Sequence, residues 1–198
     1  MMLSTTVVFA KVPVMGQVKT RIGLTHGTEL AFNIYNELLG VTAEALARLN
    51  HHIAFAGTDD PGRMQSVFPN AESFFKQSGK NLGERLHDAF LHLFDKGYAG
   101  ICAVGCDCPS LSAHDVSQSF ILLEKNDVVV GPAQDGGYYL IACKPGALPV
   151  FKASGWSTPG LLEETIAICK RNNFSHVLLD EKSDVDTHED YVKWKMNV

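Results

Sequence analysis

The first segment whose residues could bind a ligand is KVPVMGQVKTRIG, residues 11–23, which follows the apolar run TTVVFA. It contains Lys11, Lys19 and Arg21, and no Asp or Glu precedes Glu29, although the chain has a formal net charge of -5. Arginine binds phosphate through two parallel hydrogen bonds, and lysine binds it as a point charge. The segment therefore predicts a site for a small anionic ligand, with a solvated basic loop as the alternative.

Two common phosphate-binding motifs do not fit this segment. A P-loop requires G-x-x-x-x-G-K-[ST], but Pro13 and Val18 occupy the two glycine positions before Lys19. No G-x-G-x-x-G follows the apolar run, which argues against a dinucleotide site. We therefore expect the anion to be bound by lysine and arginine side chains.

A second candidate is Asp107, in the segment VGCDCPSL that closes another apolar run. Its carboxylate would repel phosphate unless a divalent cation such as Mg²⁺ lay between them. A turn or helix-capping role is the alternative. Cys106 and Cys108 flank Asp107, but no second cysteine pair has zinc-ligand spacing, so we interpret them as ordinary thiols.

A third candidate is the acidic segment SDVDTHEDYVKW near the carboxyl terminus. Thr187 and Asp190 have the spacing of a capping box for a short last helix. Asp184 and Asp186 precede them, which leaves a carboxylate free to act as a ligand.

The elements that position these residues follow from hydrophobic patterns. Short apolar runs predict strands, and they span residues 5–10, 52–57, 73–77, 101–106, 127–131, 138–143 and 176–180. Helical patterns separate most of them: a stripe from Leu30 to Leu49, and helices that start near Asn81, Ser112 and Thr158. Only turn residues separate the runs at 127–131 and 138–143, which predicts a hairpin. This alternation is typical of an α/β fold with a mostly parallel central sheet, where ligands bind at the carboxyl ends of the strands.

Composition sets the class of protein. A chain of 198 residues that is 45% hydrophobic and 20% charged fits one domain, residues 1–198. No apolar run has the roughly 20 residues of a membrane span, and no signal peptide is evident, so we expect a cytoplasmic protein. The five cysteines are an odd number, which favours reduced thiols. The acidic net charge argues against a nucleic-acid partner.

Six segments in order, from FAKVPVMGQVKTRIG through KNLGERLHDAF, GCDCPSL, GPAQDGGYYLI and WSTPGLLEET to DVDTHEDY, carry a family resemblance. Together they resemble the small bacterial glycosyltransferase-A-like proteins, formerly a domain of unknown function, of the nucleotide-diphospho-sugar transferase superfamily. The resemblance implies a Rossmann-like glycosyltransferase-A fold, with a mixed, mostly parallel sheet flanked by helices and the nucleotide on the amino-terminal half.

The resemblance also implies roles for individual residues. The nucleotide would contact Lys11, Gly16, Lys19, Arg21, Gln77, Asn81 and Gly83. Asp107 matches a metal-binding aspartate and Asp186 a second metal carboxylate, with Mg²⁺ or Mn²⁺ as the cofactor. Two ligands of one such ion should have carboxylates within roughly 6 Å of each other.

Further predictions concern catalysis and the acceptor. Asp107, Lys19 and Asp135 are the expected catalytic residues, and the sugar or acceptor would contact Gly136, Gly137, Tyr138 and Trp156. A turn and ordinary packing are the alternatives for these four. Three positions depart from the family pattern, namely Met15, Cys106 and Gln134, where a proline, a threonine and a glutamate are common.

The resulting hypothesis is a metal-dependent glycosyltransferase that uses a nucleotide-diphospho-sugar. A guanylyltransferase-like nucleotidyltransferase, which releases pyrophosphate from a nucleoside triphosphate, is the alternative, and a non-catalytic nucleotide-binding protein is the second. The expected partners are a nucleotide sugar or nucleoside triphosphate and a small-molecule acceptor. The sequence leaves a homodimer open.

Overall fold

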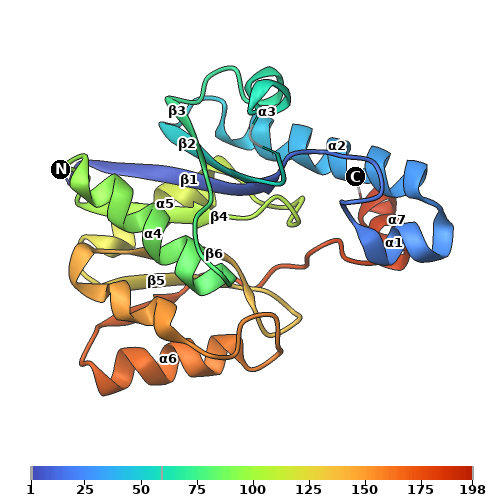
Figure 1. Cartoon of the computed structure of the whole chain (residues 1–198). Coiled ribbons are helices and arrows are strands. Elements are labelled where there is room, and N and C mark those ends of the chain that lie inside the picture. The colour runs from blue at the N-terminus through green and yellow to red at the C-terminus, as the bar shows by residue number, and fades with distance from the viewer. Residues whose placement is uncertain (1, 59, 198) are drawn as a thin grey trace.

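A seven-stranded sheet runs through the computed structural model, which describes residues 2–58 and 60–197 (Figure 1). The strand order is β3-β2-β1-β4-β6-β5-β7. β6 is antiparallel to both β4 and β5, and the other neighbouring strands are parallel. The strands are β1 Ser4–Lys11, β2 His51–Ala56, β3 Ser73–Lys76, β4 Gly100–Val104, β5 Val128–Pro132, β6 Tyr138–Cys143 and β7 His176–Leu178.

Helices cover both faces of this sheet, which explains why its central strands are continuous apolar runs. Successive residues of β1 alternate between two cores: Val8 packs with residues of α2 and α5, and Val7 packs with residues of α4 and α6. The helices are α1 Thr20–His26, α2 Thr28–Leu46, α3 Gly62–Val67, α4 Leu82–Asp95, α5 Ala113–Leu123, the 3-10 helix η1 Pro145–Lys152, α6 Leu161–Arg171 and α7 His188–Met196.

A third, smaller core joins the two ends of the chain. Ile22 of α1 and Ile34 of α2 pack with Val185, and Tyr191 and Trp194 of α7 lie against them. Figure 1 shows α1 and α7 side by side beyond the carboxyl end of β1. The carboxyl-terminal acidic segment is thereby brought to the amino-terminal cationic one.

Most predicted elements are confirmed. The seven strands match within two residues at either end, and β5 and β6 form the expected hairpin. Asn81 caps α4 by accepting a hydrogen bond from the Glu84 amide, and Ser112 starts α5 with a capping box. The capping box predicted at Thr187 is also present.

The helices differ from the prediction in two places. The helix expected at Thr158 starts at Leu161, because the Leu161 amide donates to the Thr158 carbonyl in a turn. Helix α1 was not predicted, since Ile22 is its only fully buried residue and it has no apolar stripe. Leu82, at the start of α4, is 41% exposed and does not belong to the buried face of that helix. Among the described residues, no helix has the length and apolar character needed to cross a membrane.

Candidate active site

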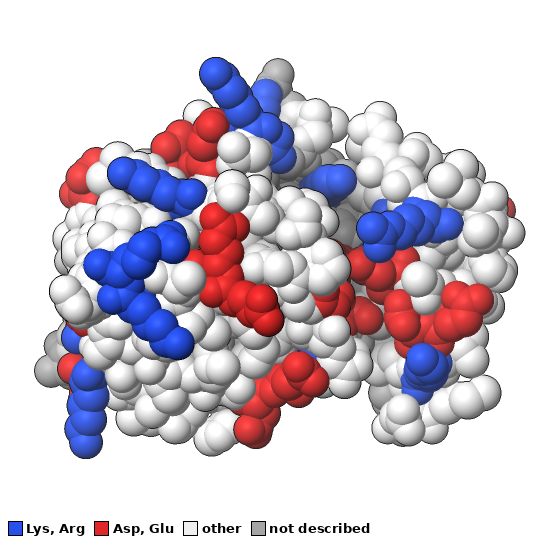
Figure 2. All heavy atoms as spheres, turned by 90° about the horizontal axis from the view of Figure 1, so that it is seen from below, with Lys and Arg blue, Asp and Glu red and all other residues white. Residues whose placement is uncertain are grey.

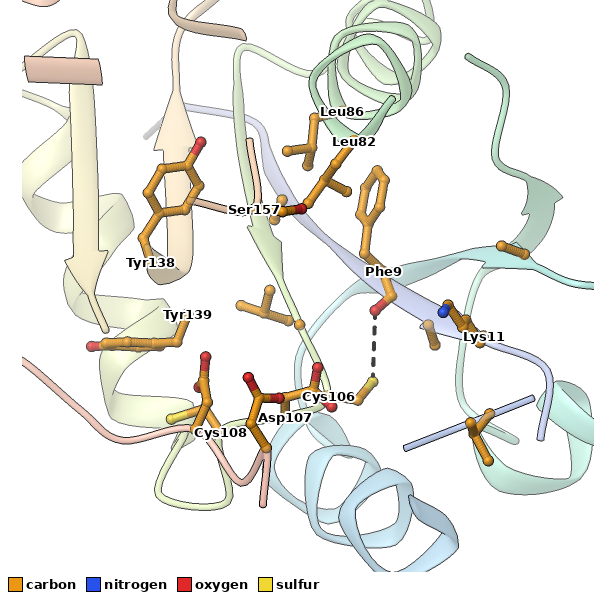
Figure 3. A pocket seen from close by; sticks show the side chains of 18 of the residues that line it. Phe9, Lys11, Leu82, Leu86, Cys106, Asp107, Cys108, Tyr138, Tyr139 and Ser157 are labelled. Carbon is orange, nitrogen blue, oxygen red and sulfur yellow. Dashed lines mark hydrogen bonds between the residues drawn. The ribbon is translucent and has the colours of Figure 1, made fainter. Parts of the chain in front are cut away.

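A cavity of about 560 Å³ opens at the carboxyl ends of β1 and β4. Its wall combines the ends of these strands with the start of α1, the first turn of α4, β6 and the segment before α7. Figure 3 shows Asp107, Cys106 and Cys108 at one end of this cavity and Leu82, Leu86 and Tyr138 at the other. The cavity therefore has a polar end and a largely apolar end.

Lys19 is the centre of the polar end. Its side chain is only 6% exposed, and its Nζ lies 2.7 Å from Asp107 Oδ1 and 3.5 Å from Asp186 Oδ1. It also donates to the Val185 carbonyl. These contacts limit the separation of the two carboxylate oxygens to about 6.2 Å, close to the expected 6 Å. The structure thus brings together three residues from distant parts of the sequence, while their role as catalytic groups and metal ligands stays a prediction.

A backbone hydrogen bond explains why the two acidic segments meet. The Val185 amide donates to the Asp107 carbonyl at 2.8 Å, and the Val185 side chain is buried in the small core beneath α1 and α2. Asp107 follows β4, whose central position in the sheet is fixed by pairing with β1 and β6. The carboxylates therefore sit on a supported frame rather than on free loops.

The other predicted cations lie around this centre. Arg21 is 76% exposed, and its Nη1 lies 3.4 Å from Asp186 Oδ2. Lys11 lines the cavity, and its backbone amide and carbonyl both bond to the buried Tyr35 hydroxyl, at 2.8 and 2.9 Å. Sequence reasoning missed Tyr35 and also Arg85, which lines the cavity from α4. The sequence could have indicated Arg85, because it lies one helical turn after the predicted cap Asn81 and therefore near the end of the helix that faces the cavity.

Asp184 is an acidic group of the site that was noted in the sequence but not assigned. Its Oδ1 is buried and has no hydrogen-bond partner among the described residues. Burial, helped by the negative charges of Asp107, Asp135 and Asp186, raises the pKa of Asp184 to about 7. A carboxylate oxygen without a hydrogen-bond partner is the type of ligand that Mg²⁺ and Mn²⁺ prefer. No three His, Cys, Asp or Glu side chains of the described chain are grouped as a metal site, so ligand oxygens would complete the coordination.

This raised pKa predicts how stability responds to pH. The folded protein holds a proton on Asp184 up to about pH 7, whereas the unfolded chain releases it near the ordinary pKa of 3.8. Wild type therefore loses stability through this group as pH rises from about 4 to 7, and the variant Asp184→Asn does not. Urea unfolding in the presence of a chelator should show that the free energy of unfolding of Asp184→Asn increases relative to that of wild type between pH 5 and pH 8. A difference in unfolding free energy that is the same at both pH values would contradict the assignment.

The predicted base-binding residues divide into two groups. Gln77 lines the cavity, and its amide nitrogen donates to the carbonyls of Ala54 and Ala10 at 2.8 and 3.3 Å. Asn81 and Gly83 do not belong to the cavity wall. Asn81 caps α4, and a Cβ on Gly83 would lie 2.2 Å from Trp156 Nε1, so Gly83 serves packing.

Gly16 also lies outside the cavity wall. Its φ of 79° places it in the left-handed region, within a turn in which the Gln17 amide donates to the Val14 carbonyl at 3.0 Å. Glycine suits this position in a turn. Gly16 shapes the cationic segment, and its expected contact with nucleotide is not supported by its place.

The segment DGGYYLI lines the cavity with its strand residues 138–141, and Tyr138 is the predicted acceptor residue among them. Asp135 is exposed, and its Oδ1 accepts a hydrogen bond from the Gly137 amide at 2.9 Å. A Cβ on Gly136 would lie 2.0 Å from the Pro159 carbonyl oxygen, so this glycine allows the hairpin to approach the turn before α6. Trp156 packs edge-on against Tyr138 with 6.0 Å between ring centroids. For Gly136, Gly137 and Trp156 the packing alternative describes the observed contacts better than an acceptor site.

All five cysteines are free and buried. Burial raises the pKa of Cys108 to about 11 and also raises that of Cys106, next to the negative charge of Asp107. Thiols with such pKa values are almost entirely protonated at neutral pH and react slowly.

We therefore expect a disulfide reagent such as Ellman's to modify less than one thiol per native chain within minutes at pH 7.5. All five should react after unfolding in guanidinium. Rapid stoichiometric labelling of Cys108 in the native protein would show that this wall of the cavity is open and polar.

Charge is unevenly distributed around the site. Figure 2 shows Asp and Glu side chains gathered along the hollow beside the part of the molecule that carries α1 and α7, with Lys and Arg near its rim.

The fold defines the class of architecture, which is that of the nucleotide-diphospho-sugar transferases. The chain is 31% identical to a protein of Desulfovibrio desulfuricans G20 that is provisionally named a nucleotide-diphospho-sugar transferase, with a TM-score of 0.90 over 100% of this chain and 88% of that one. The chain belongs to the family described as "Uncharacterized protein conserved in bacteria (DUF2064)", whose sequence profile matches residues 40–158.

More distant solved structures share the fold. A cytidylyltransferase from Leptospira borgpetersenii is 16% identical, with a TM-score of 0.63 over 98% of this chain and 86% of that one. A Mycobacterium tuberculosis protein solved as a manganese complex is 14% identical, with a TM-score of 0.60 over 98% of this chain and 99% of that one. No curated protein matches the sequence.

Proposed function

We propose that the protein is a metal-dependent glycosyltransferase that uses a nucleotide-diphospho-sugar donor. The observation that carries this proposal is the meeting of Asp107 and Asp186 on one buried ammonium, in the wall of a cavity at the carboxyl ends of the central strands. The similarity to the Desulfovibrio desulfuricans protein over the whole chain supports a sugar nucleotide as donor.

Each polar group of the site has a role in this reaction. Asp107 and Asp186 would hold Mg²⁺ or Mn²⁺, which when bound offsets charge that develops on the leaving diphosphate. Lys11, Lys19 and Arg21 bind the diphosphate oxygens through charge-assisted hydrogen bonds. These cations favour departure of the nucleoside diphosphate.

The transfer itself breaks the bond between the anomeric carbon and the diphosphate oxygen, and forms a bond from that carbon to an acceptor oxygen. The acceptor hydroxyl loses its proton, and Asp135 is the group that we assign as the base. One of its oxygens is held by the Gly137 amide, which leaves the other to accept the proton. Tyr138 and Leu82, at the apolar end, contact the less polar part of the bound substrates.

Nucleotidyl transfer is the second candidate, and the number of cations favours it. Lys11, Lys19, Arg21 and Arg85 all line the cavity, which suits the larger charge of a nucleoside triphosphate. A panel of nucleotide sugars and nucleoside triphosphates, each with and without Mn²⁺, should identify the donor by a rise in melting temperature. Release of a nucleoside diphosphate on addition of acceptors supports glycosyl transfer, and release of pyrophosphate supports nucleotidyl transfer. Binding without either product would make the protein a nucleotide-binding protein and overturn the enzymatic proposal.

The phosphate-binding role of Arg21 gives a specific prediction. Arg21→Met should weaken binding of the donor nucleotide by about 1.5 kcal/mol, or roughly tenfold, which is the scale of one hydrogen bond to a charged group. Isothermal titration calorimetry measures this change, with Arg48→Met, an exposed arginine outside the cavity wall, as the control. Equal affinities for the two variants would remove Arg21 from the site.

A further inference from the structure

The Lys19 ammonium occupies the position between two carboxylates where a divalent cation would be expected. It contacts Asp107 at 2.7 Å and Asp186 at 3.5 Å, and the Val185 carbonyl is its third oxygen partner. Three oxygens around one nearly buried positive charge form a small cation site that is already filled by the protein itself.

The same oxygens cannot serve the lysine and a metal ion together. Mg²⁺ binds oxygen ligands at about 2.0 to 2.1 Å, so an ion held by both carboxylates would lie in contact with the ammonium. Two positive charges at such a distance repel strongly in a partly buried site. Either the lysine leaves or the ion stays out.

The lysine has the freedom to leave without unfolding its helix. Its backbone has φ 43° and ψ 47° and is fixed as the residue before α1, with its carbonyl bonded to the Gly23 amide at 2.9 Å. Its side chain is a flexible four-carbon stem that can turn to another anion. Phosphate groups in the cavity are such an anion, and their oxygens would also complete the coordination of the metal.

We propose that Lys19 is a built-in competitor of the metal ion, which keeps the divalent cation out of the carboxylate pair until a phosphate-bearing donor draws the ammonium away. The proposal rests on the proposed function and adds to it an order of events: the free protein binds the metal weakly, and donor and metal enter together. Arg21 has a different part, because within the described residues its guanidinium pairs with Asp186 and not with Asp107, and it is largely exposed.

Binding of Mn²⁺ alone to the full chain, followed by the electron paramagnetic resonance signal of the free ion, tests the proposal. Lys19→Met removes the ammonium and should increase Mn²⁺ affinity without nucleotide at least about tenfold over wild type. Arg21→Met removes the same charge from the rim, and its increase should stay below about threefold because exposed charges are screened. Lys195→Met is the control outside the cavity wall, since Lys195 also contacts a carboxylate, that of Glu37, at 2.7 Å, and the Mn²⁺ affinity of this variant should equal wild type.

A further change locates the gain in affinity. Adding Asp107→Asn to Lys19→Met should abolish the increase, because the ion then lacks one of its two carboxylates. If thermal unfolding shows that Lys19→Met is not folded, Lys19→Gln replaces it in the same comparison. An Mn²⁺ affinity of the folded variant that equals wild type, or an increase that is as large in Arg21→Met, overturns the proposal.

Failure of the proposal that Lys19 competes with the metal ion can be distinguished from failure of the proposed function. If wild type binds Mn²⁺ with UDP, CDP or GDP but Lys19→Met gains nothing without nucleotide, the competitor role fails and the metal-dependent transferase stands. If Lys19→Met binds Mn²⁺ but wild type shows no Mn²⁺ binding with any of these nucleotides, Lys19 excludes the ion but is not released by phosphate, and the metal-dependent reaction fails.

Discussion

Replacing Asp107 with asparagine should lower turnover by at least about a thousandfold, a rise of about 4 kcal/mol in the activation free energy. Asparagine keeps the size of the side chain but removes the charge that would hold the metal, and a metal ion is worth several kcal/mol of charge stabilisation in such transfers. Donor affinity without metal should change far less, because Asp107 does not bind the phosphates directly. The expected pattern is a loss of kcat that added Mn²⁺ does not restore.

The partner residue makes this prediction sharper. Asp186→Asn should cause a loss of similar size, and the double variant should add little, as expected for groups that act as a unit. Asp95→Asn, an exposed carboxylate at the end of α4, is the control and should keep wild-type turnover. If Asp186→Asn alone retains full activity, Asp186 is only a partner of Lys19 and Arg21, and the shared-metal mechanism is wrong.

The parts of the fold that depend on local patterns could be predicted from the sequence. The strand runs and the caps at Asn81, Ser112 and Thr187 were found because apolar periodicity and side-chain caps act over a few residues. Helix α1 was missed because it is stabilised by packing on α2 and Val185 rather than by a stripe of its own. The order of the strands is set by long-range pairing, which no local pattern records.

The candidate site shows the same limit. Family resemblance placed Asp107, Asp186 and Lys19 in one site, and the structure brings them into contact. The resemblance could not indicate that the Lys19 ammonium lies between the two carboxylates, or that an oxygen of Asp184 is buried without a described partner. Both features depend on how the last segment of the chain packs against the end of β4. The glycine pair of DGGYYLI had two interpretations in sequence, and the approach of Pro159 favours a packing role for Gly136.

That approach predicts a large loss of stability for Gly136→Ala. The residue has φ +86°, which costs alanine about 1 to 2 kcal/mol. The new Cβ would also lie 2.0 Å from the Pro159 carbonyl oxygen, and such overpacking costs about 1 to 3 kcal/mol. The two effects together should reduce the free energy of unfolding by about 2 to 5 kcal/mol, which denaturant titration and the melting temperature both measure.

Gly97→Ala separates the two causes. Gly97 also has a positive φ, +94°, but no atom outside its chain neighbours lies within 4 Å of its ideal Cβ position, so only the backbone strain remains. Its loss should be about 1 to 2 kcal/mol. At temperatures below its melting temperature, Gly136→Ala should also have lower activity than wild type. Displacement of Pro159 would shift Ser157, which lines the cavity and has a positive φ of 65°. If the two variants lose equal stability and both keep full activity, the contact between Gly136 and Pro159 neither strains the fold nor positions the cavity wall, and the hairpin is free to meet an acceptor instead.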